Sequence, residues 1–377
     1  MPQYLFYLGR EPELSIAELE TVLKKSRLQF SAAREEKNLY RISSSSPLEA
    51  PELMERLGGT VKILESIGPA DNPAAAIHDY LCRLPAAGKL SFSLSGPNAE
   101  RLAIETKKNL KSAGRSVRYI EPKNTATILH NNLVATGTDL TMHRNELFVT
   151  RAIQPIEAWS ERDYGRPGYD PKSGMLPPKL ARLMINLSGA ENDGALLDPF
   201  CGSGTVLIEA LSLGFARIVG SDHSPKAIAD SERNYKWFAE RLGGAKKIDF
   251  KLYQSDAREL FKRLPAHSVA AVVTEPYLGK PLRGREPRDF VIAQARELAD
   301  LYTHVFRTFA KILKPDAPVV FVLPEFRYRD EVTSVNCLGA IKKAGFSVCP
   351  LSPDSDSLLY ARPGQWVARQ IWKFQKN

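Results

Sequence analysis

The chain has 377 residues, more than a single hydrophobic core usually spans, so two or three domains are expected. With 43% hydrophobic and 25% charged residues, its composition is typical of a soluble globular protein and excludes a disordered or fibrous one. Its formal net charge of +9 favours a nucleic-acid partner, because clustered Lys and Arg release the counterions condensed on phosphates. A basic globular protein without such a partner is the alternative.

The cysteines and the N-terminal residues bear on metal binding and location. Cys-x-x-Cys spacing is absent, so the sequence predicts neither a zinc site nor a disulfide framework, and it favours the reducing cytoplasm. The first residues, MPQYLFYLGREPELS, lack the basic stretch and apolar run of a secretion signal, and no segment approaches the roughly 18 apolar residues of a membrane helix. We therefore expect a cytoplasmic protein with no metal and no membrane association.

Residues 1–68 are expected to form a small α+β unit, and residues 69–157 a second one. In the first unit a strand over 4–8 precedes a helix over 14–24, where Ser15 and Glu18 indicate a capping box. The later elements are a turn at the serine run 43–46, a helix over 51–57 and a strand over 61–67. The second unit has strands over 89–94, 117–119 and 147–153 and a helix over 98–113.

Basic residues gather in the second unit. Lys107, Lys108 and Lys111 lie on its helix, and Arg115, Arg118 and Lys123 follow. They predict either a basic surface that binds RNA or an ordinary solvated helix face.

Residues 158–175 have the composition of an interdomain linker, rich in Gly, Pro and charge and without apolar periodicity. From residue 176 to 377, short apolar strands alternate with helical stretches, which predicts an α/β domain with a doubly wound sheet. The expected strands cover 194–197, 217–221, 249–253, 270–273 and 319–323, and segments 346–349 and 367–374 suggest an antiparallel hairpin that closes the sheet.

The strongest chemical signal is DPFCGSGT, residues 198–205, which follows a strand and opens a helix. Ligands of doubly wound sheets bind at the carboxyl ends of the strands, where glycines allow close approach to the backbone. A dinucleotide fingerprint would require a third glycine at position 207, where the chain has Leu207. We therefore expect a different nucleotide-like cofactor, held by the segment that contains Asp198, Pro199, Phe200, Gly202, Gly204 and Thr205.

The next two strands each end in an acidic residue, Asp222 in VGSDHS and Asp256 in YQSDAR. A carboxylate after the second strand can accept hydrogen bonds from ribose hydroxyls, and one after the third strand from an adenine amino group. Each Asp alone could simply cap a helix. Their joint occurrence after the glycine loop favours the cofactor interpretation.

The fourth strand ends in Thr274-Glu275-Pro276-Tyr277, which resembles the Asp/Asn/Ser-Pro-Pro-Tyr/Phe motif of amino methyltransferases. The amine lone pair of a base is delocalised, so acceptors must orient the NH2 group for attack on a sulfonium methyl and receive its proton. With Pro276 and Tyr277 aligned, Thr274 takes the Asp/Asn position and Glu275 replaces the first Pro. Either Thr274 or Glu275 would then be the acceptor.

The whole arrangement resembles the THUMP-domain tRNA guanine-N2 methyltransferases. The resemblance covers nearly the whole chain and depends on RLGGTVKILE, on RDYGRPGYDPKSGMLPPKLARLMINL before the glycine loop, on DPFCGSGT, on the TEPY variant and on ARPGQWVARQI near the end. It implies an N-terminal ferredoxin-like unit, a THUMP-like RNA-binding unit, a linker and a Rossmann-type catalytic domain that uses S-adenosylmethionine.

The resemblance also implies a substrate and residue roles. The substrate would be a guanosine amino group in tRNA, often at position 10. Tyr277 would stack on the extruded guanine. The basic loop that would hold nearby phosphates contains Lys280, Arg283, Arg285 and Arg288.

Two other functions are also compatible with the sequence. One is a DNA adenine-N6 or cytosine-N4 methyltransferase, which uses a similar fourth motif but usually carries a separate target-recognition domain. The other is a catalytically inactive RNA-binding homologue, which the departure at Thr274 and Glu275 makes worth considering. The sequence does not indicate which nucleotide is modified, how many methyl groups are added, the oligomeric state or a need for a partner subunit.

Overall fold

The computed structural model describes residues 1–85, 88–168, 175–243, 248–328, 331–362 and 364–377. Packing of the backbone divides the chain into two compact units. Unit 1 comprises Met1–Pro12, Arg27–Arg56 and Thr60–Ile156, and unit 2 comprises Glu13–Ser26, Leu57–Gly59 and Glu157–Asn377. The four-part division expected from the sequence, with boundaries at residues 68, 157 and 175, stays a prediction.

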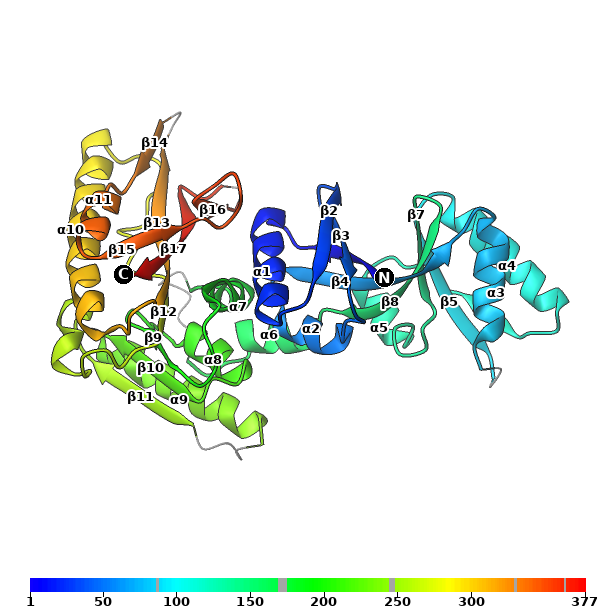
Figure 1. The fold of residues 1–377 in the computed structure, drawn as a ribbon, viewed down its shortest axis with the longest axis horizontal. Coiled ribbons are helices and arrows are strands. Elements are labelled where there is room, and N and C mark those ends of the chain that lie inside the picture. The colour runs from blue at the N-terminus through cyan, green and yellow to red at the C-terminus, as the bar shows by residue number, and fades with distance from the viewer. Residues whose placement is uncertain (86–87, 169–174, 244–247, 329–330, 363) are drawn as a thin grey trace. The chain divides into compact units, whose positions relative to one another are not determined.

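Among the described residues, unit 1 is built on one eight-stranded sheet (Figure 1). Its strands, in spatial order, are β2 (Phe30–Glu36), β3 (Leu39–Ser44), β1 (Gln3–Leu8), β4 (Thr60–Pro69), β8 (Glu146–Ile153), β7 (Asp139–His143), β5 (Leu90–Ser95) and β6 (Val117–Tyr119). The long strand β4 pairs with β1 and with β8, both antiparallel. The sheet therefore continues across the boundary expected near residue 69.

Unit 1 also contains helices, two of which pack on the β5–β8 part of this sheet. The helices are α2 (Ala50–Arg56), α3 (Pro73–Arg83), α4 (Ala99–Ser112) and α5 (Thr125–His130). Ile77 of α3 and Leu110 of α4 are fully buried and pack in one cluster with Phe92 and Leu140 of the sheet. Burial of these side chains is what holds α3 and α4 on the strands.

Some elements of unit 1 were not expected from the sequence. They are β2, β3, α3, α5 and β7. The expected turn at the serine run is wrong for Ser43 and Ser44, which belong to β3, and Ser44 is fully buried. The Ser44 hydroxyl donates 2.7 Å to the carbonyl of Ser46, so a polar side chain is satisfied inside the structure.

Helix α1 (Pro12–Lys25) belongs to unit 2, and the expected capping box in it is wrong. Ser15 and Glu18 lie inside the helix and are both buried. The Glu18 carboxylate accepts hydrogen bonds from the backbone N–H groups of Gly58 (2.8 Å) and Gly59 (2.7 Å) and from the Asn186 amide (2.7 Å). Burial raises the pKa of Glu18, and these three donors act in the opposite direction.

In the described part of unit 2, nine strands form one sheet. The path of the sheet runs through β11 (Asp249–Gln254), β10 (Arg217–Asp222), β9 (Ala195–Asp198), β12 (Ala271–Thr274), β13 (Pro318–Tyr328), β17 (Val367–Lys376) and β15 (Phe346–Cys349), with β14 (Glu331–Ser334) on β13 and β16 (Ser357–Tyr360) on β17. Neighbouring strands from β11 to β13 are parallel. The chain order reverses between β9 and β12, and this is the position where doubly wound sheets bind ligands.

The expected antiparallel closure at the C-terminus is confirmed, because β17 pairs antiparallel with both β13 and β15. The connection between β15 and β17 is more than a loop, since it contains β16.

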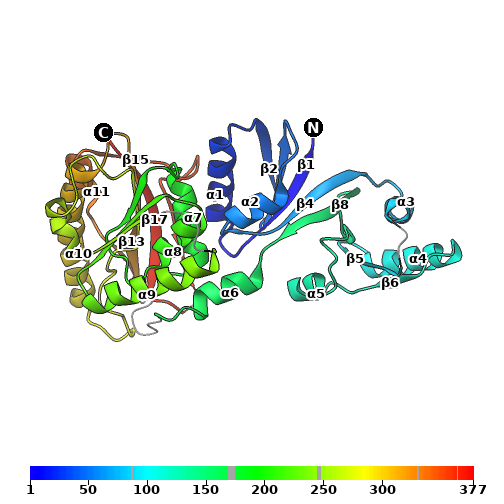
Figure 2. The same cartoon turned by 90° about the horizontal axis from the view of Figure 1, so that it is seen from below.

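Helices cover both faces of this sheet (Figure 2). One face carries α7 (Pro178–Ser188), α8 (Thr205–Ser212) and α9 (Pro225–Arg241), and the other carries α10 (Arg288–Ile312) and α11 (Leu338–Lys343). Leu196 and Val273 face the first layer, whereas their neighbours Leu197 and Val272 face the second. This two-sided burial explains why the strands are continuous apolar runs, and the expected doubly wound α/β fold is confirmed.

The first part of the expected linker is helical, because Ile156–Tyr164 form helix α6. Trp159 and Arg162 of this helix are buried. The carboxylate of the fully buried Glu209 in α8 accepts hydrogen bonds from Arg162 (2.7 Å) and from Arg182 of α7 (2.8 Å), and both guanidinium groups lie over the Trp159 ring. Residues 169–174 of the expected linker lie outside the described residues.

Candidate active site

The glycine loop connects the end of β9 to the start of α8. Gly202 (φ 52°) and Gly204 (φ 84°) adopt left-handed backbone conformations that glycine tolerates best. A Cβ atom at Gly204 would lie 2.9 Å from the Ser231 Oγ, whereas one at Gly202 would meet nothing within 4 Å. The loop is thus packed against α9 at Gly204 and open at Gly202, so a ligand can approach the backbone there.

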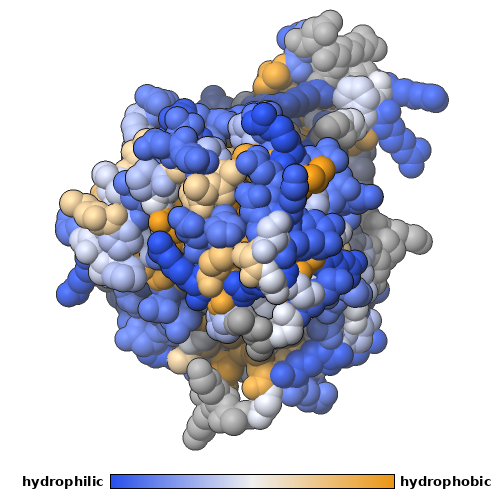
Figure 3. All heavy atoms as spheres, turned by 90° about the vertical axis from the view of Figure 1, so that its right-hand side faces the viewer, coloured by the Kyte–Doolittle hydropathy of each residue, from blue (hydrophilic) through white to orange (hydrophobic). Residues whose placement is uncertain are grey.

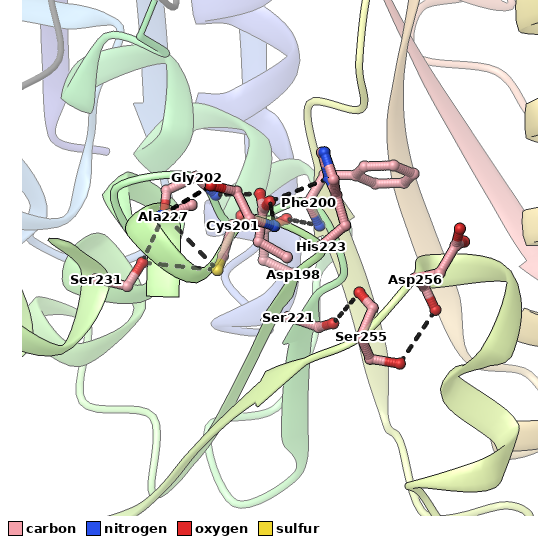
Figure 4. A network of polar contacts seen from close by, with 12 residues as sticks. Asp198, Phe200, Cys201, Gly202, Ser221, His223, Ala227, Ser231, Ser255 and Asp256 are labelled. Atoms are coloured by element: carbon pink, nitrogen blue, oxygen red, sulfur yellow. Dashed lines mark hydrogen bonds and ion pairs between the residues drawn. The ribbon is translucent and has the colours of Figure 1, made fainter. Parts of the chain in front are cut away.

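Asp222, at the end of β10, holds this loop in shape. Its carboxylate accepts hydrogen bonds from the backbone N–H of Gly202 (3.1 Å) and of Ser224 (2.9 Å). The Ser231 hydroxyl of α9 donates 2.8 Å to the carbonyl of Gly202 (Figure 4). Asp222 therefore lies directly beside the open part of the loop, where an acceptor for ribose hydroxyls is expected.

Asp256 follows β11 and caps the short helix η1 (Ala257–Lys262). Its carboxylate accepts from the backbone N–H of Arg258 (2.8 Å) and pairs with the guanidinium of the same residue (2.6 Å). The Arg258 hydrogen bond lowers the pKa of Asp256. Asp256 therefore does cap a helix, which was the alternative to cofactor binding. A ligand that bound Asp256 would share its carboxylate with Arg258.

Asp198 lies beneath the loop with 2% of its surface exposed. Its Oδ1 atom accepts hydrogen bonds from the Phe200 backbone N–H (3.1 Å) and from the Thr274 hydroxyl (2.6 Å). Burial raises the pKa of Asp198 to about 7, although both hydrogen bonds act in the opposite direction. Pro199 is buried and Phe200 is half-buried. Asp198 thus connects the glycine loop to the end of β12.

The tetrapeptide 274–277 separates into a buried part and an accessible part. Thr274 is fully buried, and its hydroxyl is donated to Asp198. The carboxylate of Glu275, the first residue after β12, forms an ion pair with the Arg369 guanidinium of β17. Pro276 is buried. Tyr277 is 53% exposed, and its carbonyl accepts 2.7 Å from the Tyr302 hydroxyl of α10.

Comparison with known proteins agrees with this geometry. The family model described as RMKL-like, methyltransferase domain matches residues 167–344. A tRNA (guanine(10)-N2)-dimethyltransferase of Methanothermobacter thermautotrophicus is 30% identical over 276 residues, which cover 71% of this chain and 75% of that protein. The chain belongs to the tRNA (guanine-N2) methyltransferase family. A protein of the same name from Methanocaldococcus jannaschii is 28% identical over 154 residues, 40% of this chain and 38% of that one.

A solved structure, that of TrmN from Thermus thermophilus, matches over the full length of both chains with a TM-score of 0.53 and 17% identity. This likeness shows the fold. Membership of the family makes the protein an S-adenosylmethionine-dependent methyltransferase. The residues at the glycine loop fit that cofactor, because an open backbone at Gly202 lies beside the carboxylate acceptor of Asp222.

Sequence reasoning missed three residues that hold the site of this methyltransferase. The buried Arg166 donates 2.6 Å to the Thr205 hydroxyl at the start of α8. The Asn234 amide donates to the carbonyls of Ser203 (2.8 Å) and Gly168 (2.9 Å). The third residue is Arg369. Both arginines occur in segments that carry the family resemblance, RDYGRPGY and ARPGQWVARQI, but neither segment shows what its arginine contacts.

The basic residues predicted to bind RNA lie at two places. In unit 1, Lys108, Lys111 and Arg118 are exposed and Lys107 is half-buried. Figure 3 shows the face with α3 and α4, which is largely hydrophilic. Arg115 has a structural role, because its guanidinium donates to the carbonyls of Leu81, Leu84 and Pro85 at the end of α3.

The second basic group lies in the loop between β12 and α10, where Lys280, Arg283 and Arg285 are exposed. The Glu286 carboxylate accepts from the backbone N–H groups of Arg283 (2.7 Å), Gly284 (2.9 Å) and Arg285 (3.1 Å). These bonds lower the pKa of Glu286. They also fix the backbone from which the basic side chains project.

Within the described residues, no group of three or more His, Cys, Asp or Glu could hold a metal ion. In the same part of the chain, no helix has the length and apolar character needed to cross a bilayer.

Proposed function

We propose that this protein transfers a methyl group to the exocyclic N2 amine of a guanosine in tRNA, at position 10. The observation that carries the proposal is the carboxylate of Glu275 at the end of β12, one residue after a threonine that is hydrogen-bonded to Asp198 of the glycine loop. The relative from Methanothermobacter thermautotrophicus, whose name states this substrate, supports the choice of base.

Glu275 is proposed to be the acceptor for the substrate amine. Thr274 is fully buried and donates its hydroxyl to Asp198, so it is poorly placed to accept from a base. The Glu275 side chain is 12% exposed, and its carboxylate forms an ion pair with the Arg369 guanidinium. A carboxylate there can orient the amine and receive the proton that leaves the nitrogen after methyl transfer.

Cofactor binding is proposed to involve the predicted residues in two ways. S-adenosylmethionine supplies an electrophilic methyl group when it is bound. Asp222 would accept from the ribose hydroxyls, and Asp256 would accept from the adenine amino group. The shape of the loop depends on Asp198, Pro199, Gly202, Gly204 and Thr205, and Phe200 would contact the cofactor from the loop.

Tyr277 is proposed to stack on the extruded guanine, because its ring is the exposed part of the tetrapeptide. Lys280, Arg283 and Arg285 would contact neighbouring phosphates, since they project from a loop that starts at the same strand end.

Residues 69–157 are proposed to be a THUMP-like RNA-binding unit that follows a ferredoxin-like unit. The parallel pairing of β5 with β6 around α4, together with the exposed Lys108 and Lys111, supports an RNA-binding role for this part of the chain.

Mass spectrometry of nucleosides tests the proposal. Bulk tRNA is incubated with the protein and S-adenosylmethionine, and digested nucleosides are compared with those from a reaction without protein. We expect guanosine carrying one or two methyl groups on N2. Methylated adenine or cytosine from duplex DNA in a parallel reaction would favour a DNA methyltransferase, and incorporation into neither substrate would favour an inactive RNA-binding homologue.

A further inference from the structure

The ion pair between Glu275 and Arg369 lies in an unusual position for two charged groups. The side chains are 12% and 11% exposed, and Glu275 directly follows β12 whereas Arg369 lies in β17. The guanidinium meets the carboxylate with Nε and with Nη2, the latter at 3.3 Å from Oε2. Removing two charges from water costs free energy that can offset their attraction, so stability alone does not explain this ion pair. A role in the active site would explain it.

A second contact joins the same two parts of unit 2. A Cβ atom at Gly284 would lie 2.5 Å from the Cζ2 atom of Trp366, so the indole packs directly on the backbone of the loop after β12. The carbonyl of Trp366 accepts 2.8 Å from the Arg327 backbone N–H of β13, which fixes the start of β17. The beginning of β17 therefore forms one side of the region where the loop with Tyr277 and the basic residues begins.

The remaining hydrogen-bonding capacity of the pair matches one base. A carboxylate offers about four lone-pair positions, and Arg has five N–H donors, so the contacts between Glu275 and Arg369 leave acceptors and donors unused. Guanine presents two adjacent donors, N1–H and N2–H, followed by the acceptor O6. Adenine and cytosine instead have a ring-nitrogen acceptor beside their amino group. This nitrogen would face the carboxylate, and two acceptors repel each other.

We propose that Arg369 is a specificity-determining residue, which together with Glu275 recognises the Watson–Crick edge of guanine. Glu275 accepts from N1–H and N2–H, and Arg369 donates to O6 while it holds the carboxylate in place. This inference deepens the proposed function and rests on it, because it presupposes that guanine N2 is the methyl acceptor. Discrimination then comes from a half-buried pair of charges that, of these three bases, only guanine satisfies on both sides.

Base analogues at the target position test this role. The guanosine at position 10, the proposed target, is replaced by 2-aminopurine, which keeps the 2-amino group but lacks N1–H and O6. Single-turnover rates are measured for both tRNAs. For the wild-type protein we expect guanosine to react roughly 100-fold faster or more, because two charge-assisted hydrogen bonds are lost with the analogue.

Arg369→Gln should lower this guanosine preference at least about 10-fold, mainly by slowing the reaction of guanosine, with cofactor affinity unchanged. Arg369→Lys keeps the positive charge without the planar fork and should show an intermediate preference. It also provides the comparison if the Gln variant does not fold. Arg241→Gln, which removes an exposed ion pair with Glu161 in the same unit, is the matched control and should keep the wild-type preference.

An equal loss of rate on both tRNAs in the Arg369 variants would overturn the proposal, because it would indicate a purely structural ion pair. A wild-type protein with no preference for guanosine over 2-aminopurine would overturn it as well. Absence of methylation on the unmodified tRNA would instead contradict the proposed function itself.

Discussion

At the scale of single residues, Asp222 has two roles that a binding experiment can measure. It holds the Gly202 backbone, and it is the proposed acceptor for the cofactor ribose. Asp222→Ala should weaken S-adenosylmethionine binding by about 1.5 to 3 kcal/mol, the usual value of hydrogen bonds to a charged group. Isothermal calorimetry measures the change. Asp249→Ala, an exposed residue at the opposite end of the neighbouring strand, should leave the affinity intact. Equal affinities in both variants would mean that the ribose assignment is wrong.

Asp198 makes stability depend on pH. Its carboxyl group has a pKa of about 7 in the folded protein, above the ordinary value of 3.8. The unfolded chain therefore loses this proton at a lower pH than the folded protein does. The contribution of Asp198 to stability falls as pH rises from about 4 to about 7 and is constant above that. Asp198→Asn can keep both hydrogen bonds to Oδ1 without the charge. The stability of this variant relative to wild type should thus rise over that range by a few kcal/mol, roughly 1.36 kcal/mol per pH unit.

Urea unfolding at several pH values, without cofactor, tests this expectation. Parallel pH profiles for the Asn variant and the wild type would show that the carboxyl titrates normally in the folded protein.

At the scale of elements, whether a strand could be predicted from the sequence depended on how that strand is buried. The strands of unit 2 that are covered on both faces are apolar runs, and β10 was expected over 217–221 and lies at Arg217–Asp222. Strand β2 was missed because most of its residues are exposed, so FSAAREE has neither an apolar run nor alternation. The Ser15 and Glu18 pattern failed because Glu18 finds its partners in Gly58 and Asn186, which are distant in sequence.

The candidate site shows the same division. The glycine loop and the acidic residues at strand ends could be recognised from the sequence because each motif consists of adjacent residues. The sequence could not decide whether Thr274 or Glu275 is the acceptor, because each has a partner that is distant in sequence. Thr274 is hydrogen-bonded to Asp198, and Glu275 is paired with Arg369.

Helix α6 was missed because its inner surface is charged. Glu209 lies between Arg162 and Arg182, and all three are buried. Glu209→Ala would leave two buried guanidinium groups without their carboxylate and should cost about 3 to 5 kcal/mol of unfolding free energy. Chemical denaturation measures this loss. Glu161→Ala breaks an exposed pair with Arg241 and should cost less than about 1 kcal/mol. Similar losses in the two variants would contradict the structural role assigned to the buried cluster.

At the scale of the whole molecule, tRNA affinity is predicted to come mainly from residues 1–157. A fragment that starts near residue 158 would lack α1 and Leu57–Gly59, which belong to unit 2, so the full chain is the appropriate protein. The triple change Lys107→Ala, Lys108→Ala and Lys111→Ala should weaken binding and reduce the slope of log affinity against log salt by up to about 0.7 to 0.9 per lost phosphate contact.

A charge-matched control changes three exposed lysines of unit 2. These are Lys226, Lys236 and Lys262. Fluorescence anisotropy over a range of salt concentrations measures both slopes. If the control variant loses as much affinity and slope as the α4 variant, the basic residues of α4 have no special role.

The central claim is that Glu275 accepts the proton of a guanosine amine. Single-turnover methylation of tRNA by Glu275→Gln, with saturating S-adenosylmethionine, tests it most directly. We predict that this variant binds the cofactor normally but transfers the methyl group at least about 100-fold more slowly than the wild type, because an amide orients the amine without accepting its proton. Thr274→Val should have a smaller effect, since its hydroxyl acts through Asp198. A Glu275→Gln variant that methylates guanosine at the wild-type rate would contradict the account.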